Sequence, residues 1–141
     1  MSVMRSHLSR RPNRQHDRSG VAAVEFAVCL PVLILLVLGS IEAASFMFLK
    51  QGLNVAAYEG IRVAVRDSGT AAEARSVAEN ILNARGIRNA NINFSVADVS
   101  NVPRGEIISV TVSASTNANS PLGGQFLPDR TLDAAVFMVK E

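Results

Sequence analysis

The chain has almost none of the residue types on which metal sites and nucleophilic catalysis depend. Its two histidines, His7 and His16, lie near the N-terminus, and Cys29 is the only cysteine among 141 residues. A single cysteine excludes an intrachain disulfide, and no histidine remains after residue 16 to activate a serine or to complete a zinc site. We therefore expect no catalytic residue, no metal ion and no cofactor, which argues against an enzyme.

Charged residues are missing from a long stretch near the N-terminus. Residues 26–41 are an uncharged run of 16, and Glu25 and Glu42 are the only carboxylates in residues 21–49. Because a helix needs about 20 apolar residues to cross a bilayer, residues 21–49 are predicted to form a transmembrane helix, with Glu42 solvated or interfacial where the helix emerges. Cys29 lies inside this run as an apolar packing residue. A lipid-attachment cysteine would instead end its apolar segment and follow a small residue.

Positive charge is concentrated ahead of this segment. Residues 1–20 contain five arginines and one aspartate, a net charge of +4, which leaves −2 for the rest of the chain. Positive residues beside a first apolar segment stay in the cytoplasm, so we expect one crossing, with the N-terminus inside and residues from about 50 onward outside. An arginine-rich arm is also found in nucleic-acid binders, but this one has no aromatic residue for base stacking, and we expect no nucleic-acid partner.

The helical pattern continues beyond the apolar run. Residues 50–67 contain no proline and have one small or apolar face and one polar face, which predicts a single helix over residues 21–67. Pro31 removes a backbone donor and is expected to kink this helix, and Gly39, Gly52 and Gly60 weaken it. The polar face recurs every fourth residue: Lys50, Asn54, Tyr58, Arg62 and Arg66.

The remaining sequence predicts a second helix and a small sheet. Thr70 and Glu73 form a capping box before an amphipathic stretch that Gly86 is placed to stop. Two runs then alternate apolar and polar residues, at 89–99 and 107–115, and a third strand is expected at 130–141 after an irregular loop. The exported part, residues 50–141, is therefore predicted to be α+β: the end of the long helix, a second short helix and an antiparallel sheet of about three strands.

The placement of Glu25 makes sense if the chain is cut after Gly20. Val21 would then carry a new α-amino group, with Glu25 at the fifth position of the mature chain and Phe26 after it. Four residues of helix rise by about 6 Å, so the carboxylate lies near its own ammonium and could meet that of a neighbouring subunit. An ammonium and a carboxylate that are each costly in apolar surroundings neutralise one another when they pair.

At this point the chain resembles the type IV pilin-like proteins, and within them the TadE-like minor pilins, or pseudopilins, of tight-adherence (Flp) pili. The resemblance rests on "GVAAVEF" at 20–26, on "AVCLPVLILLVLG" at 27–39 with Pro31, and on "QGLNVAAYEGIRVA" at 51–64. It covers residues 18 to about 66 by motif. Two residues depart from the family pattern: Tyr58 stands where the family often has arginine, and Ile61 where it often has a small residue.

The resemblance implies a pilin-like fold and a processing pathway. Residues 1–20 would be a basic cytoplasmic leader removed after Gly20 by a prepilin peptidase, an aspartate protease of the inner membrane, and residues 21–49 would remain as the assembly helix. The other implied partners are the major Flp pilin, other minor pilins, the inner-membrane secretion platform and the lipid bilayer. The candidate subunit contact is Tyr58, Glu59, Gly60 and Arg62, within which Glu59 and Arg62 form an i, i+3 pair.

Three other readings stay open. The chain could be a single-pass anchored protein with an exported binding domain, uncut at Gly20. It could also be a secreted protein cut by ordinary signal peptidase at "AAS", residues 43–45, so that Phe46 comes first. An enzyme is the third. The mature N-terminus distinguishes the first two from the pilin-like reading.

Overall fold

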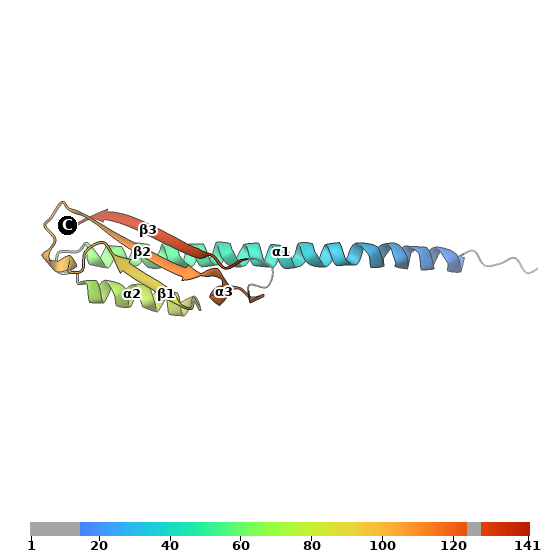
Figure 1. Ribbon diagram of the computed structural model, residues 1–141. Coiled ribbons are helices and arrows are strands. Elements are labelled where there is room, and N and C mark those ends of the chain that lie inside the picture. The colour runs from blue at the N-terminus through green and yellow to red at the C-terminus, as the bar shows by residue number, and fades with distance from the viewer. Residues whose placement is uncertain (1–14, 124–127) are drawn as a thin grey trace, which may run out of the picture. The chain divides into compact units, whose positions relative to one another are not determined.

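The computed structural model describes residues 15–123 and 128–141, so most of the predicted basic leader and residues 124–127 of the irregular loop lie outside it. The elements follow in the order α1 (Gln15–Ala64), α2 (Ala71–Ala84), β1 (Ala90–Phe94), η1 (Val99–Asn101), β2 (Ile107–Ser115), α3 (Thr116–Asn119) and β3 (Thr131–Val139) (Figure 1). The chain divides into two compact units, Met1–Leu38 and Gly39–Glu141, and α1 contributes to both. The fold is α+β, as predicted.

The first unit is helical and apolar. Its described part is α1, which continues without a break through Pro31. The stretch Gly20–Ala64 contains an 18-residue window with a mean hydropathy of 2.8, none of it buried, and is long and apolar enough to cross a membrane. The large apolar side chains between Val21 and Val37 are all exposed. An exposed apolar surface of this length is typical of a helix that is covered by lipid or by other chains.

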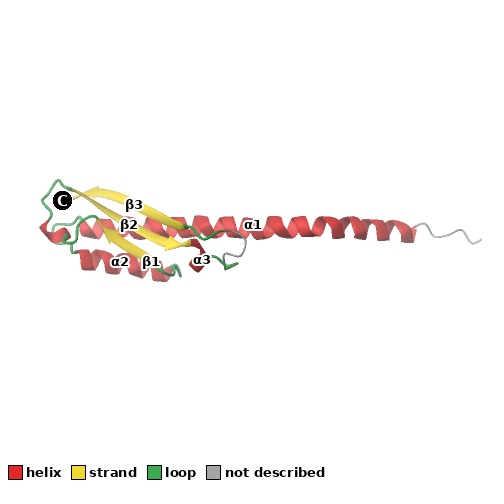
Figure 2. Cartoon of the chain, in the orientation of Figure 1, coloured by secondary structure: helices red, strands yellow, loops and turns green. Residues whose placement is uncertain are grey.

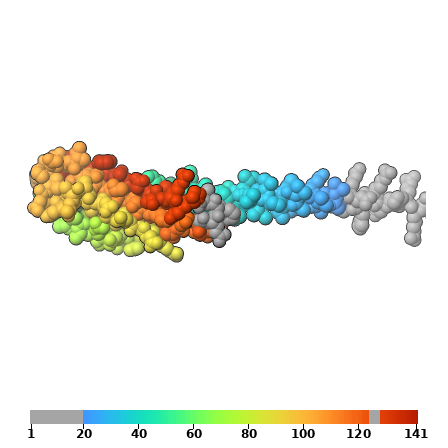
Figure 3. Space-filling view, in the orientation of Figure 1, coloured from blue at the N-terminus to red at the C-terminus, as the bar shows by residue number. Residues whose placement is uncertain are grey.

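The second unit packs a three-stranded antiparallel sheet in the order β1-β2-β3 with α1 and α2 (Figure 2). Side chains of β2 alternate as predicted, and Ile108, Val110 and Val112 are fully buried while Ile107 is exposed. Much of α1 within this unit is covered by the sheet in the space-filling view (Figure 3). The α1 residues that face the core are small or apolar: Leu49, Leu53, Ala56, Ala57, Gly60, Ile61 and Ala64.

The second helix forms and ends at the residues that its sequence signals indicate. The backbone N–H of Glu73 donates to Thr70 Oγ1 at 3.2 Å, and Gly86 has a φ of +67° just beyond the helix. The helix contacts α1 at Gly60, where an added Cβ would lie 3.3 Å from Ala78 Cβ. Gly60 therefore permits the close approach of the two helices inside the unit.

The two residues after β3 cap the end of α1. Lys140 Nζ donates to the carbonyl of Ala64 at 3.1 Å and to that of Arg66 at 2.5 Å, and the N–H of Glu141 donates to the carbonyl of Val65 at 3.0 Å. The last carbonyls of a helix have no partner within it, and an ammonium group there also complements the helix dipole. Lys140 is buried, so this cap forms part of the fold rather than a surface contact.

Some element boundaries differ from the prediction. The helix begins at Gln15 instead of Val21, and it ends at Ala64 instead of Asp67. The first strand ends at Phe94, and the next residue still bonds to β2: the N–H of Ser95 donates to the carbonyl of Ser109 at 2.9 Å, and Ser95 Oγ accepts the N–H of Ser109 at 3.0 Å. The short helix α3 and the 3-10 turn η1 were not predicted. Both begin with side-chain caps, from Ser115 and Asp98, that have no periodic signal.

Candidate processing and assembly site

The bond between Gly20 and Val21 lies within α1. Both residues are exposed, and a Cβ at Gly20 would have no heavy atom within 4 Å. No packing within the described chain therefore requires glycine at this position. Because a protease binds an extended backbone, cutting here requires the first turns of α1 to unwind locally. Residues 1–14 of the leader lie outside the described residues.

Glu25 and Phe26 follow on the next turn of α1, and both are exposed. The rise of the helix places Glu25 about 6 Å along the axis from Val21. Pro31 and Gly39 lie further along the same helix, and an added Cβ at Gly39 would also meet nothing within 4 Å. The residues predicted for processing and assembly are thus all present on an uncovered helical surface.

The expectation of a solvated or interfacial Glu42 was wrong. This carboxylate is 2% exposed, and the Ser120 hydroxyl lies 2.8 Å from both of its oxygens. The backbone carbonyl of Glu42 also accepts from Ser45 Oγ at 2.7 Å. The second unit therefore begins to enclose α1 already at Glu42, and the loop after α3 supplies the polar partner that a buried carboxylate requires.

The fold buries one residue of the candidate subunit contact and leaves the other three accessible. Arg62 and Glu59 form the predicted pair, with an N–O distance of 3.5 Å, and Tyr58 is exposed beside them. Gly60 is buried against α2 and is not available at the surface, which corrects its inclusion in this set. Tyr58, Glu59 and Arg62 are the residues that a neighbouring subunit could reach.

A comparison with known families bears on this helix. Residues 20–62 match the family model described as TadE-like protein. This segment of the chain is TadE-like. The TadE-like segment begins at Gly20 and ends at Arg62, so it contains every residue predicted for processing, the assembly helix and the candidate subunit contact. No curated protein and no solved structure matches the chain.

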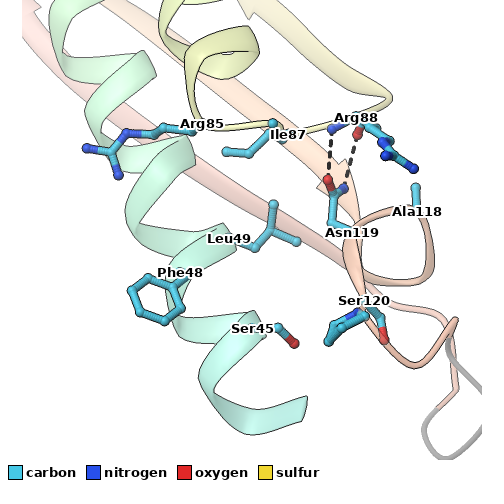
Figure 4. Close-up of a pocket in the computed structure, with 11 residues that line it drawn as sticks. Ser45, Phe48, Leu49, Arg85, Ile87, Arg88, Ala118, Asn119 and Ser120 are labelled. Carbon is cyan, nitrogen blue, oxygen red and sulfur yellow. Dashed lines mark hydrogen bonds between the residues drawn. The ribbon is translucent and has the colours of Figure 1, made fainter. Parts of the chain in front are cut away.

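The structure also contains a groove that sequence reasoning missed. It has a volume of about 750 Å³ and lies among α1, the loop between α2 and β1, and α3 (Figure 4). The Asn119 side chain joins two of these elements: its Oδ1 accepts from the N–H of Arg88 at 2.8 Å, and its Nδ2 donates to the carbonyl of Arg88 at 3.0 Å. Within residues 15–123 and 128–141, no three His, Cys, Asp or Glu side chains are placed to hold a metal ion.

Proposed function

We propose that this chain is a TadE-like minor pilin, or pseudopilin, that acts in the assembly of a tight-adherence (Flp) pilus and in the secretion, adhesion or biofilm formation that depends on it. The observation that carries the proposal is the extent of the TadE-like segment, because it begins at Gly20 and includes Glu25 and Arg62. The chain acts in this proposal through helix packing and not through catalysis.

The proposed sequence of events begins in the bacterial inner membrane. The leader stays in the cytoplasm, α1 crosses once, and the second unit is exported. A prepilin peptidase hydrolyses the Gly20–Val21 bond and releases the leader with a new carboxylate on Gly20, while Val21 keeps the new ammonium. Glu25 then pairs with an ammonium of the mature chain or of a neighbouring pilin, which offsets the cost of a charge in apolar surroundings.

The burial of Glu42 supports a defined membrane-spanning stretch. Residues 21–41 would have a helical length of about 31 Å, close to the thickness of the hydrocarbon core. The next residue, Glu42, is enclosed by the second unit. We therefore place the span at 21–41 and the start of the exported part at Glu42.

The exposed apolar surface of α1 supports the proposed partners. After release of the leader, this surface is compatible with lipid and equally with the apolar helices of the major Flp pilin and of other minor pilins. The secretion platform of the inner membrane would transfer α1 from the lipid to the helices of the other pilins.

The mature N-terminus tests the proposal. The full chain with a C-terminal tag is expressed in a host that has the prepilin peptidase and in the same host without it, and the intact mass and the N-terminal sequence are measured. We expect Val21 first only when the peptidase is present. An intact leader in both hosts would favour the uncut anchored protein. A start at Phe46 would favour signal peptidase, although that cut removes the buried Glu42 carboxylate to which Ser120 donates.

A further inference from the structure

The groove of the second unit combines apolar and cationic side chains. On α1 it is lined by Ser45, Phe48 and Leu49, and Phe48 is 70% exposed (Figure 4). Arg85 and Arg88 line it from the loop after α2, and both are exposed. The groove lining includes no acidic residue. Such a surface is suited to a ligand with an anionic group joined to apolar chains.

The two arginines are held next to α1 by packing and by hydrogen bonds. A Cβ at Gly52 would overlap Ile87 Cδ1 and would lie 3.4 Å from Arg85 Cδ, so the absence of a side chain at Gly52 lets this loop lie directly on α1. The backbone of Arg88 is fixed by Asn119, whose Nδ2 also donates to the carbonyl of Ser115 at 2.9 Å. The loop is thus positioned at both ends, while the two guanidinium groups remain accessible.

Among the described residues, neither guanidinium forms an ion pair with an acidic residue. The ion pairs of the described residues are Arg62–Glu59 and Arg104–Asp67, and neither includes Arg85 or Arg88. Two acidic groups near the groove have partners of their own: Asp129 accepts from Ser115 Oγ at 2.7 Å and from the N–H of Asn117 at 3.1 Å, and the Glu42 carboxylate accepts from Ser120 Oγ at 2.8 Å. A charge that the fold does not neutralise remains available to an anionic ligand.

The position of the groove along α1 identifies the source of such a ligand. Phe48 is six residues beyond Glu42, or about 9 Å of helix, and the headgroup layer adds about 5–8 Å to each side of the hydrocarbon core. If α1 spans the membrane over residues 21–41, Phe48 therefore lies just outside the phosphate groups, and Gly52, on which the arginine loop packs, is about 6 Å of helix further out, within the length of an arginine side chain. Exposed aromatic and arginine side chains are enriched at that depth.

We propose that Arg85 and Arg88 bind phosphodiester groups of anionic phospholipids, each from its own side of the groove (Figure 4), with Phe48 and the exposed Met47 in contact with the lipid surface. The proposal rests on the single-pass anchoring proposed above. It assigns the exported domain a second contact with the membrane, beyond its spanning helix. This contact would hold the unit against the bilayer before assembly.

The chain contains no tryptophan, so F48W supplies a single fluorescent reporter at the groove. The full-length F48W protein is reconstituted in bilayers that contain equal small fractions of brominated phosphatidylglycerol or brominated phosphatidylcholine. The ratio of quenching by the two lipids gives the relative partition coefficient at the groove. We expect the ratio to favour phosphatidylglycerol and to fall by up to about fivefold for each of R85Q and R88Q, with a weaker preference at high salt.

A matched variant and a control with inorganic phosphate distinguish a lipid site from the alternatives. R62Q removes the same charge from α1 about 21 Å beyond Phe48 and should leave the ratio unchanged. Inorganic phosphate, added to phosphatidylcholine bilayers at constant ionic strength, should not change the emission of F48W. A ratio of one, or a preference that persists in the R85Q/R88Q double variant, would overturn the proposal. A response to inorganic phosphate alone would assign the site to free phosphate and would overturn the lipid assignment.

Anchoring is measured in the same samples by resistance to alkaline extraction. Protein that is extracted would contradict the single-pass anchoring on which both proposals depend. If the protein stays in the membrane but the two brominated lipids quench F48W equally, the result contradicts the lipid site and leaves the anchoring intact. We expect R85Q and R88Q to leave cleavage after Gly20 unchanged, so cleavage remains an independent test of the pilin assignment.

Discussion

The hydroxyl of Ser120 donates to the carboxylate of Glu42, 78 residues away, at 2.8 Å. The donor follows α3, and the acceptor lies on α1 directly after the apolar run. The hydrogen bond therefore attaches the loop after α3 to the first turn of α1 that the second unit encloses.

Removing this donor is expected to loosen the loop. In S120A the Glu42 carboxylate stays buried without its partner, which costs about 1–3 kcal/mol, and the N–H of Leu122 also loses the Ser120 oxygen that accepts it at 3.1 Å. We expect faster amide hydrogen exchange over residues 116–122 of the full chain in detergent. S76A, at an exposed position of α2, is the control. Identical exchange in S120A and S76A would indicate that Glu42 is solvated.

Substitution of Gly20 should block processing without harming the fold. The scissile backbone must enter a protease cleft at the membrane face, where the lack of a Cβ allows close approach. Since a Cβ at Gly20 meets nothing in the described chain, G20A and G20L should fold normally and accumulate as the longer, membrane-bound form. Immunoblot mobility and intact mass measure this. Normal cleavage of G20L would count against the proposed site.

Glu25 is expected to act after processing. In E25Q the carboxylate that pairs with a new ammonium is lost, and an unpaired charge in apolar surroundings costs about 3–5 kcal/mol. We expect Val21 at the N-terminus of E25Q, together with loss of co-purification with the major pilin from detergent extracts. E59Q, which removes a charge from the exposed Arg62 pair, is the comparison. Unchanged co-purification of E25Q would refute an ammonium partner for Glu25.

Two glycines should respond in opposite ways to alanine. A Cβ at Gly69 would overlap the carbonyl oxygen of Val63 and would lie 3.0 Å from that of Ala64, so G69A should destabilise the second unit by about 1–3 kcal/mol. At Gly39 the space is open, and alanine should stabilise the helix by up to about 1 kcal/mol. Urea unfolding in detergent compares the two variants. Equal midpoints would contradict the packing at Gly69.

Acid should loosen the start of α3 through Asp129. Hydrogen bonds from Ser115 Oγ and then from the N–H of Asn117 hold the pKa of Asp129 below its ordinary value of 3.8. A lowered pKa in the folded state means that the contribution to stability is present above pH 3.8 and is lost as the pH falls through the folded value. Protection factors over residues 115–119, which correct for the intrinsic pH dependence of amide exchange, should therefore fall at low pH in the natural chain. D129N, which cannot titrate, should show no such fall, and an identical fall in D129N would exclude Asp129 as its cause.

Much of the fold could be predicted because its signals are local. The long helix follows from an uncharged run and a continuing two-faced pattern, and the strands follow from alternation at residues 91–96 and 107–115. The processing motif is local too, since Gly20 and Glu25 are close in sequence and lie on one helix. The short helix α3 was missed because four residues carry no periodic pattern.

Only the tertiary structure decided which residues that are far apart in sequence contact one another. By sequence Glu42 is a charge at the end of an apolar run, and only the fold places Ser120 against it. Lys140 could likewise be any surface lysine until the sheet brings it to the last carbonyls of α1. Hydropathy and periodicity report which face of an element is buried, because they are properties of one segment. The identity of the buried neighbour depends on how segments pack, and the sequence of either segment does not contain it.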